Sequence, residues 1–155
     1  MLYSVVLLLH SWLRWGVVVL GVLALVKSLM GWRRGRDWTS GDRGLQVAFT
    51  ATFDLQMLLG MTLYFVLSPL TPRSLEALRM NMSIGQLRFF GLEHPLLMLL
   101  ALTAAHVASG LSRRATSAVA KHRAWALGLL ITMLLVVLAI PWPMLSYGRP
   151  LLRGF

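Results

Sequence analysis

Four long apolar stretches, separated by short polar segments, dominate the pattern of the chain. They cover residues 2–30, 45–67, 89–111 and 124–140, with bounds good to a few residues. Each stretch is close to the roughly 20 residues that a helix needs to cross a bilayer. The pattern predicts an all-α fold, a single transmembrane domain over residues 1–155. Because the loops are short, we expect a four-helix bundle with antiparallel neighbours.

The polar segments carry signals for where helices begin and end. Ser40, two residues before Asp42, is typical of the N-cap of the second helix. Apolar residues at helical spacing predict a short interfacial helix over residues 74–82, in the longest connection. Pro95 lies early in the third stretch. Either the helix begins near His94 with the proline in its first turn, or a longer helix bends there.

Composition indicates that lipid is the solvent for most of the surface. Hydrophobic residues make up 57% of the chain and charged residues 13%, whereas soluble domains carry about 25% charged residues. The net charge of +10 lies mainly in the polar segments between the apolar stretches, so membrane topology explains it better than nucleic-acid binding does. The absence of cysteine excludes disulfides, iron–sulfur clusters and covalently attached haem.

The distribution of basic residues predicts an orientation. Nine lie near the polar segments that follow the first and third stretches, and five lie on the other side. The positive-inside rule then places both termini outside, an N-out/C-out topology. The nine are Lys27, Arg33, Arg34, Arg36, Arg43, Arg113, Arg114, Lys121 and Arg123; the five are Arg73, Arg79, Arg88, Arg149 and Arg153.

Pairs of ionisable residues occur inside two of the apolar stretches. His10 and Arg14 are four residues apart in the first stretch and share one helix face. Glu93 and His94 lie early in the third stretch. Such groups are costly in hydrocarbon and usually face a protein interior, a cofactor or a water-filled cavity. With both termini outside, His10 and His94 lie at similar depth, so we expect the two places to meet.

Two neutral imidazoles on facing helices are the axial pair that a b-type haem requires. His10 and His94 are therefore candidate haem ligands, with Arg14 or Arg88 as partners for the propionates. In a structural alternative, His10 bonds a backbone carbonyl or Glu93, and Arg14 snorkels or forms an ion pair. In a third interpretation, the His10–Glu93–His94 cluster is a metal or proton site.

The second stretch adds a polar stripe. Gln56, Gly60 and Tyr64 lie on one face of the predicted helix, which makes Gln56 a candidate cofactor-binding residue, and Asp54 points elsewhere. A buried carboxylate needs a partner, and Arg14 lies at a similar depth. We expect an Asp54–Arg14 ion pair, with a proton relay or a quinone-site acid as the functional alternative for Asp54.

Three other titratable residues are secondary candidates. Glu93 either orients the imidazole of His94 or protonates a quinone. His106 follows His94 by twelve residues, about 120° around the helix, and this phase does not support a second haem. We expect His122 to be solvated, since it lies in a predicted basic loop over residues 112–123.

Short motifs in all four stretches resemble a family of small bacterial four-helix membrane proteins that are often labelled cytochrome b. The resemblance implies b-type haem ligation at the positions of His10 and His94. One position departs from the pattern, because members tend to carry a histidine where this chain has Asp54. The motifs are Leu9-His10-Ser11-x-Leu13-Arg14-Trp15, Leu55-Gln56 with Gly60, Glu93-His94 with Met98, and Ile140-Pro141-Trp142-Pro143.

The resemblance and the residues together predict a b-type cytochrome-like protein of the bacterial inner membrane. Its cofactors would be haem b and a quinone, and it would pass electrons between quinol and a respiratory partner protein. The alternatives are a non-enzymatic membrane subunit or scaffold, and the metal or proton site described above. A homo-oligomer is also open, with Gly16, Gly21, Gly60 and Gly128 as contact points.

Overall fold

The computed structural model describes residues 1–152, and all of the regular structure in that range is helical. Four helices are long and apolar enough to cross a membrane: Leu2–Arg34, Ser40–Leu67, Gly85–Arg114 and Ala118–Ala139. The elements in chain order are α1 (Leu2–Arg34), α2 (Ser40–Thr62), the π-helical turn η1 (Leu63–Leu67), α3 (Leu75–Asn81), α4 (Gly85–Arg88), the π-helical turn η2 (Phe89–Glu93), α5 (His94–Arg114) and α6 (Ala118–Ala139).

The predicted all-α fold with four membrane-length helices is confirmed, while the helix bounds needed correction. The short helix predicted over residues 74–82 is α3, capped by the Ser74 hydroxyl. The largest error is at α6, which begins at Ala118 and not near residue 124. The Ser117 hydroxyl accepts from the backbone N–H of Ala120, and a side-chain cap of this kind starts a helix. The predicted loop over residues 112–123 therefore shrinks to a short turn.

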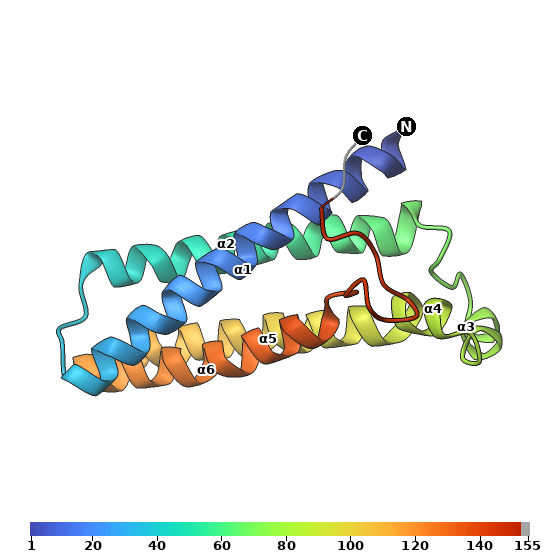
Figure 1. Cartoon of the computed structure of the whole chain (residues 1–155). Coiled ribbons are helices and arrows are strands. Elements are labelled where there is room, and N and C mark those ends of the chain that lie inside the picture. Colours follow the sequence, from blue (N-terminus) through green and yellow to red (C-terminus); the bar gives the residue numbers. More distant parts are fainter. Residues whose placement is uncertain (153–155) are drawn as a thin grey trace.

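The four long helices form a closed ring in which α1 contacts α2 and α6, and α5 contacts the same two helices. Figure 1 shows α1 and α2 lying over α5 and α6, with the segment after α6 folded back toward the start of α1. Helices α1 and α5 are thus diagonal to each other. Side chains from these two helices can meet only at the centre of the bundle.

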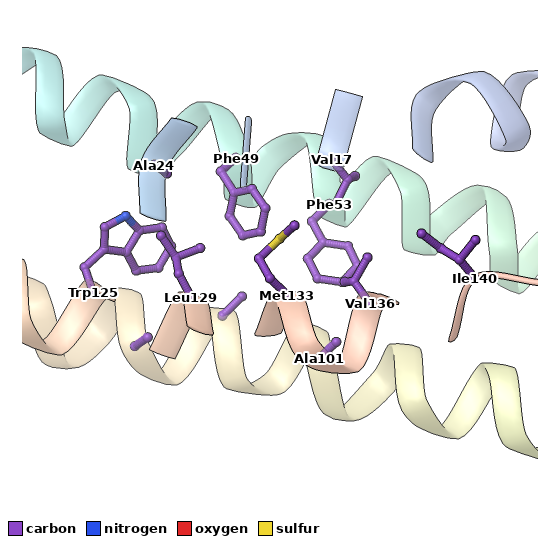
Figure 2. Close-up of a cluster of buried hydrophobic side chains, with 12 residues drawn as sticks. Val17, Ala24, Phe49, Phe53, Ala101, Trp125, Leu129, Met133, Val136 and Ile140 are labelled. Atoms are coloured by element: carbon purple, nitrogen blue, oxygen red, sulfur yellow. The ribbon is translucent and has the colours of Figure 1, made fainter. Parts of the chain in front are cut away.

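The core combines large aromatic residues from α2 and α6 with small residues from α5. Phe49 contacts Phe53 and Trp125, with ring centroids 5.8 Å and 6.0 Å apart, and Figure 2 shows this cluster between the helices. Helix α5 contributes fully buried alanines, which let α6 approach closely. At Gly128 the approach is so close that a Cβ atom would overlap the Cβ of Ala108.

Helix α5 begins at His94 with Pro95 in its first turn, which is the first of the two geometries expected from the sequence, and a π-helical turn precedes it. In an α-helix the N–H of residue 95 would donate to the carbonyl of Gly91, but proline has no N–H. The Tyr64 hydroxyl donates to that carbonyl instead, at 2.9 Å. The third span therefore continues from α4 through η2 into α5, and a hydrogen bond from α2's extension replaces the missing one.

The N-cap of α2 is Thr39, one residue before the expected Ser40. The Thr39 hydroxyl accepts from the Asp42 N–H, and the Asp42 carboxylate accepts from the Thr39 N–H at 2.8 Å. Asp42 also pairs with Lys27 of α1 at 3.1 Å. This capping box therefore fixes where α2 begins and ties it to α1.

Removing the cap is expected to weaken the bundle measurably. Thr39→Ala deletes one side of the capping box, and loss of such a cap costs about 1 kcal/mol. Thermal unfolding in detergent should show the midpoint falling relative to the unmodified protein. Thr103→Ala is the matched control, because that hydroxyl bonds only the Leu99 carbonyl of its own helix. An equal loss in both variants would contradict a specific role for the cap.

Candidate functional site: two histidines at the centre of the bundle

A cavity of about 130 Å³ lies among the four long helices near the start of α1. Its polar lining comes chiefly from His10 and Arg14 of α1, Gln56 of α2 and His94 of α5. Arg149, from the segment after α6, closes part of it. The structure thus brings together four candidate residues from three helices.

The imidazoles of His10 and His94 lie close together inside the bundle, in an edge-type arrangement. Their ring centroids are 6.3 Å apart and their planes are inclined at 74°. A metal–imidazole bond is about 2 Å long, and the ligating nitrogen lies about 1 Å from its ring centre, so two imidazoles on opposite sides of one metal have centroids about 6 Å apart. The observed separation matches that requirement.

The tautomer of His94 is fixed by a backbone carbonyl. Its Nδ1 lies 2.8 Å from the carbonyl oxygen of Ala139 in α6, and because a carbonyl can only accept, Nδ1 carries the proton. Nε2 is then left with its lone pair. Metal-ligating histidines are commonly oriented in this way by a carbonyl on the second nitrogen.

Glu93 does not orient His94, which corrects one of the expected roles. The Glu93 carboxylate instead accepts from Arg88 Nε at 2.7 Å. Neither residue lines the cavity. Arg88 is therefore removed as a partner for a group bound between the histidines, and Glu93 is removed from the His10–Glu93–His94 cluster.

His10 is held by Gln56. The Gln56 amide nitrogen lies 3.0 Å from the His10 carbonyl and 3.3 Å from His10 Nε2. The atom beside the carbonyl must be nitrogen, since two oxygens would repel, so Gln56 can donate to both acceptors and Nδ1 of His10 carries the ring proton. Gly60, one turn further on, leaves room for the ring, because a Cβ there would lie 3.2 Å from His10 Cε1.

Several polar atoms around the cavity have no partner in the described part of the chain. Nδ1 of His10, Nε of Arg14 and Oε1 of Gln56 are all buried without a hydrogen bond. Buried polar groups in native proteins are nearly always satisfied. Three such atoms around one cavity indicate a site for a polar or metal-bearing group.

Arg14 bonds to the C-terminal segment and not to Asp54. Its Nη2 donates to the Leu151 carbonyl at 2.5 Å, and Trp15 Nε1 donates to the same oxygen at 3.1 Å. Asp54 pairs with His106 of α5 at 2.7 Å, with both side chains about half exposed. The expected Asp54–Arg14 pair is therefore wrong, since the two side chains face different sides of the bundle.

Arg149 is a cavity residue that the sequence did not reveal. Its guanidinium lies over the ring of Phe90, 5.4 Å from the centroid, and it lines the same cavity as His10. The only local signal was a basic residue in a short tail after Pro141-Trp142-Pro143. Arg149 reaches the cavity because the segment after α6 folds back across the bundle. No spacing of residues along the chain indicates that return.

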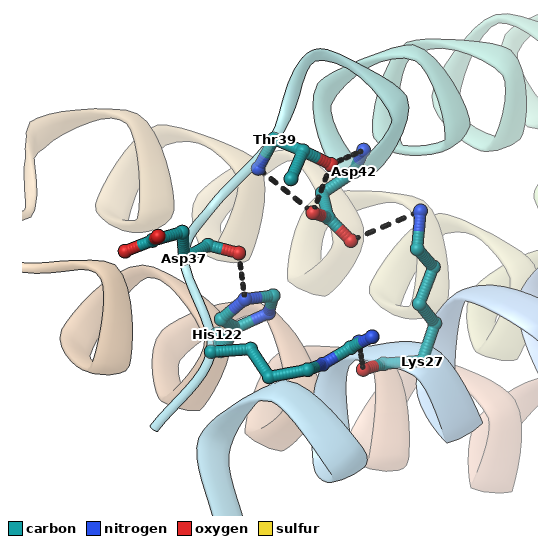
Figure 3. A network of polar contacts seen from close by, with 6 residues as sticks. Lys27, Asp37, Thr39, Asp42 and His122 are labelled. Atoms are coloured by element: carbon teal, nitrogen blue, oxygen red, sulfur yellow. Dashed lines mark hydrogen bonds and ion pairs between the residues drawn. The ribbon is translucent and has the colours of Figure 1, made fainter. Parts of the chain in front are cut away.

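His122 is buried, which corrects the expectation that it is solvated. It has no exposed surface, and its Nε2 lies 3.3 Å from the Asp37 carbonyl (Figure 3). It is four residues into α6, on the same face as Trp125, Ala126 and Leu129. The i, i+3, i+4, i+7 spacing of these residues would have placed it in the core if the Ser117 cap had been recognised.

The two imidazoles are suitable haem ligands, but the cavity around them is small. Neutral imidazole is a haem ligand, and two guanidinium groups line the same cavity. A cavity of 130 Å³ is smaller than the roughly 300–1,000 Å³ of most ligand pockets. A macrocycle therefore requires the Gln56 side chain to leave His10 and the helices to move apart. Within residues 1–152, no group of three metal-ligating His, Cys, Asp or Glu residues occurs.

The chain was compared with protein families, curated proteins and solved structures. No protein-family model, no curated protein and no solved structure matches the chain.

Proposed function

We propose that this protein is a b-type cytochrome-like membrane protein that holds haem b between His10 and His94. The observation that carries the proposal is the pair of imidazoles from diagonal helices, with centroids 6.3 Å apart. In a membrane-length bundle, two such groups at the centre are costly unless they serve a cofactor or a polar partner.

Each surrounding residue has a role that follows from its contacts. The Ala139 carbonyl holds the proton of His94 on Nδ1 and leaves Nε2 as a ligand. Arg14 and Arg149 supply positive charge at the cavity, suited to the carboxylates of a haem. Bound haem contributes one-electron redox chemistry. The apolar walls contributed by Phe53, Val136 and Ile140 limit the access of water.

The electron partners that suit this location are a quinol in the bilayer and a membrane-bound respiratory partner protein. Nine basic residues at one end of the bundle and five at the other favour an N-out/C-out orientation in a bacterial inner membrane. The histidine pair then lies toward the outer side. The four glycines expected as oligomer contacts instead lie against neighbouring helices within the bundle, so a homo-oligomer would use other surfaces.

The absorption spectrum of the purified protein tests the proposal. The protein should be produced in haem-replete cells, purified in detergent, and measured reduced and oxidised. We expect sharp bands in the reduced-minus-oxidised spectrum and about one haem per chain by pyridine haemochrome assay. A colourless protein that also fails to take up added haem would refute the proposal.

A second candidate is a site for the head group of a quinone. The specific observation is the set of unpaired donors, Nδ1 of His10 and Nε of Arg14, which suit carbonyl oxygens, in a cavity too small for a haem without rearrangement. Quinone extraction from the colourless protein would distinguish it. Bound quinone that is lost in His10→Ala would support this candidate, and its absence would leave the cluster as a structural one in a membrane subunit or scaffold.

A further inference from the structure

A second pocket, of about 280 Å³, lies at the opposite end of the bundle from the histidine pair. It is formed where the connection from α1 into α2 meets the turn between α5 and α6. Trp38 forms one wall, and its ring also contacts His122 at a centroid distance of 4.8 Å. One wall of the pocket therefore packs against a buried side chain, while much of the remaining lining is exposed.

Three cations surround this pocket. Arg43 comes from the first turns of α2, Arg113 from the end of α5 and Lys121 from the start of α6. None of the three forms an ion pair with a carboxylate anywhere in residues 1–152. The nearby Asp42 carboxylate is engaged by Lys27 and Thr39 (Figure 3). The positive charge around the pocket is thus not neutralised by the protein.

The deep side of the pocket carries two unpaired polar side chains. Gln46 and Ser112 line it and are only 2% and 1% exposed. Nε2 of Gln46 and Oγ of Ser112 are both buried without a hydrogen-bond partner. Both atoms can donate a hydrogen bond. Leaving such donors unsatisfied is costly, so an acceptor bound in this pocket would be stabilised by both of them.

We infer that this pocket binds a phosphate group. Three uncompensated cations and two buried neutral donors match a group with several strong acceptor oxygens and negative charge. The pocket lies at the end of membrane-length helices, where basic pockets commonly hold the head groups of anionic lipids. The same chemistry would also accept inorganic phosphate, and the two sources are separated by experiment.

The test uses full-length protein that has been delipidated in detergent. Three probes are titrated separately: phosphatidylglycerol in mixed micelles, phosphatidylcholine in mixed micelles, and inorganic phosphate. The readouts are the thermal-unfolding midpoint and native mass spectrometry of bound species. We expect phosphatidylglycerol, inorganic phosphate or both to bind at one site per chain and to raise the thermal-unfolding midpoint. Phosphatidylcholine should bind more weakly than phosphatidylglycerol.

The decisive comparison is between two double variants of equal charge. Arg113→Gln with Lys121→Gln removes two cations of the pocket, and we expect at least a tenfold loss of affinity for the probe that binds. Arg114→Gln with Arg123→Gln removes two cations from the same two helices that do not line the pocket, and we expect less than a twofold change. Equal losses in both would overturn the inference in favour of diffuse surface charge.

A third variant leaves the charge unchanged. Ser112→Ala removes only the buried hydroxyl, and we expect a several-fold weaker affinity for the bound probe with little change in the midpoint of the probe-free protein.

A response to inorganic phosphate alone identifies a free anion as the ligand, and a response to phosphatidylglycerol alone identifies a lipid head group. Failure of the unmodified protein to bind either probe would overturn the inference. The haem spectrum is independent of all these outcomes.

Discussion

Replacing His94 with alanine is expected to abolish the reduced-state absorption bands of the purified protein. The variant removes the imidazole whose Nδ1 is fixed on the Ala139 carbonyl, so a proposed haem ligand and its orientation would be lost together. His10→Ala should act in the same way, because it removes the other imidazole of the proposed ligand pair. Both variants are measured by reduced-minus-oxidised spectra and by haem content per chain.

Two controls separate ligation from general damage to the bundle. His106→Ala removes a half-exposed histidine that pairs with Asp54 outside the cavity, and it should keep the full spectrum. Added imidazole should restore bands in His94→Ala, since a small ligand can occupy the space that the side chain leaves. A His94→Ala protein with unchanged bands, or a His106→Ala protein without them, would argue against the assigned ligands.

A substitution at Gln56 distinguishes a haem site from a purely structural cluster. Because its amide donates toward His10 Nε2, it competes with any metal at that nitrogen. We therefore expect Gln56→Leu to retain haem with equal or higher affinity, whereas a purely structural cluster would predict only lost stability. Loss of haem in Gln56→Leu would show that this side chain holds the cofactor and does not merely occupy its place.

Replacing Gly128 with leucine is expected to cause a large loss of stability. A Cβ at this position would overlap the Cβ of Ala108 and lie 3.3 Å from its Cα. The two Cβ atoms are bonded directly to the backbones of α6 and α5. No rotamer change can therefore relieve the overlap, and the two helices must separate. Overpacking usually costs about 1–3 kcal/mol, and we expect at least the upper end here.

The measurement is the unfolding midpoint in detergent or in mixed micelles of increasing denaturant content. Gly110→Leu is the matched control, because no atom lies within 4 Å of a Cβ built there. Gly128→Ala should also destabilise, and adding Ala108→Gly should recover most of that loss because it removes the opposing Cβ. Additive effects of the two substitutions would contradict direct contact between these positions.

Some corrections at the site trace to signals within the sequence. His122 lies on the helix face that Trp125 and Leu129 define, and the Ser117 N-cap that starts α6 lies inside the segment predicted as a loop. Thr39 formed a more complete cap for α2 than Ser40. In these cases the local rules of helix capping and helix periodicity are sufficient to place the residues.

Other features had no local signal. Asp54 pairs with His106 because α2 and α5 are neighbours in the ring, while Arg14 on α1 faces the returning C-terminal segment. The Tyr64 hydroxyl satisfies the carbonyl that Pro95 cannot reach. Each contact joins residues that are between 27 and 137 positions apart. The order of helices around the ring decides such contacts.

The sequence by itself indicated a lipid environment and the four long helices. Apolar stretches of membrane length must be helical, because hydrocarbon leaves backbone groups no other partner, and the polar residues within them marked the positions of greatest cost. Only the tertiary structure decided which of those residues meet. It brings His10 and His94 together from diagonal helices, closes their cavity with Arg149, and gathers three cations over Gln46 and Ser112. The physical reason is that helix periodicity fixes a residue's face but not the neighbour that the face will contact.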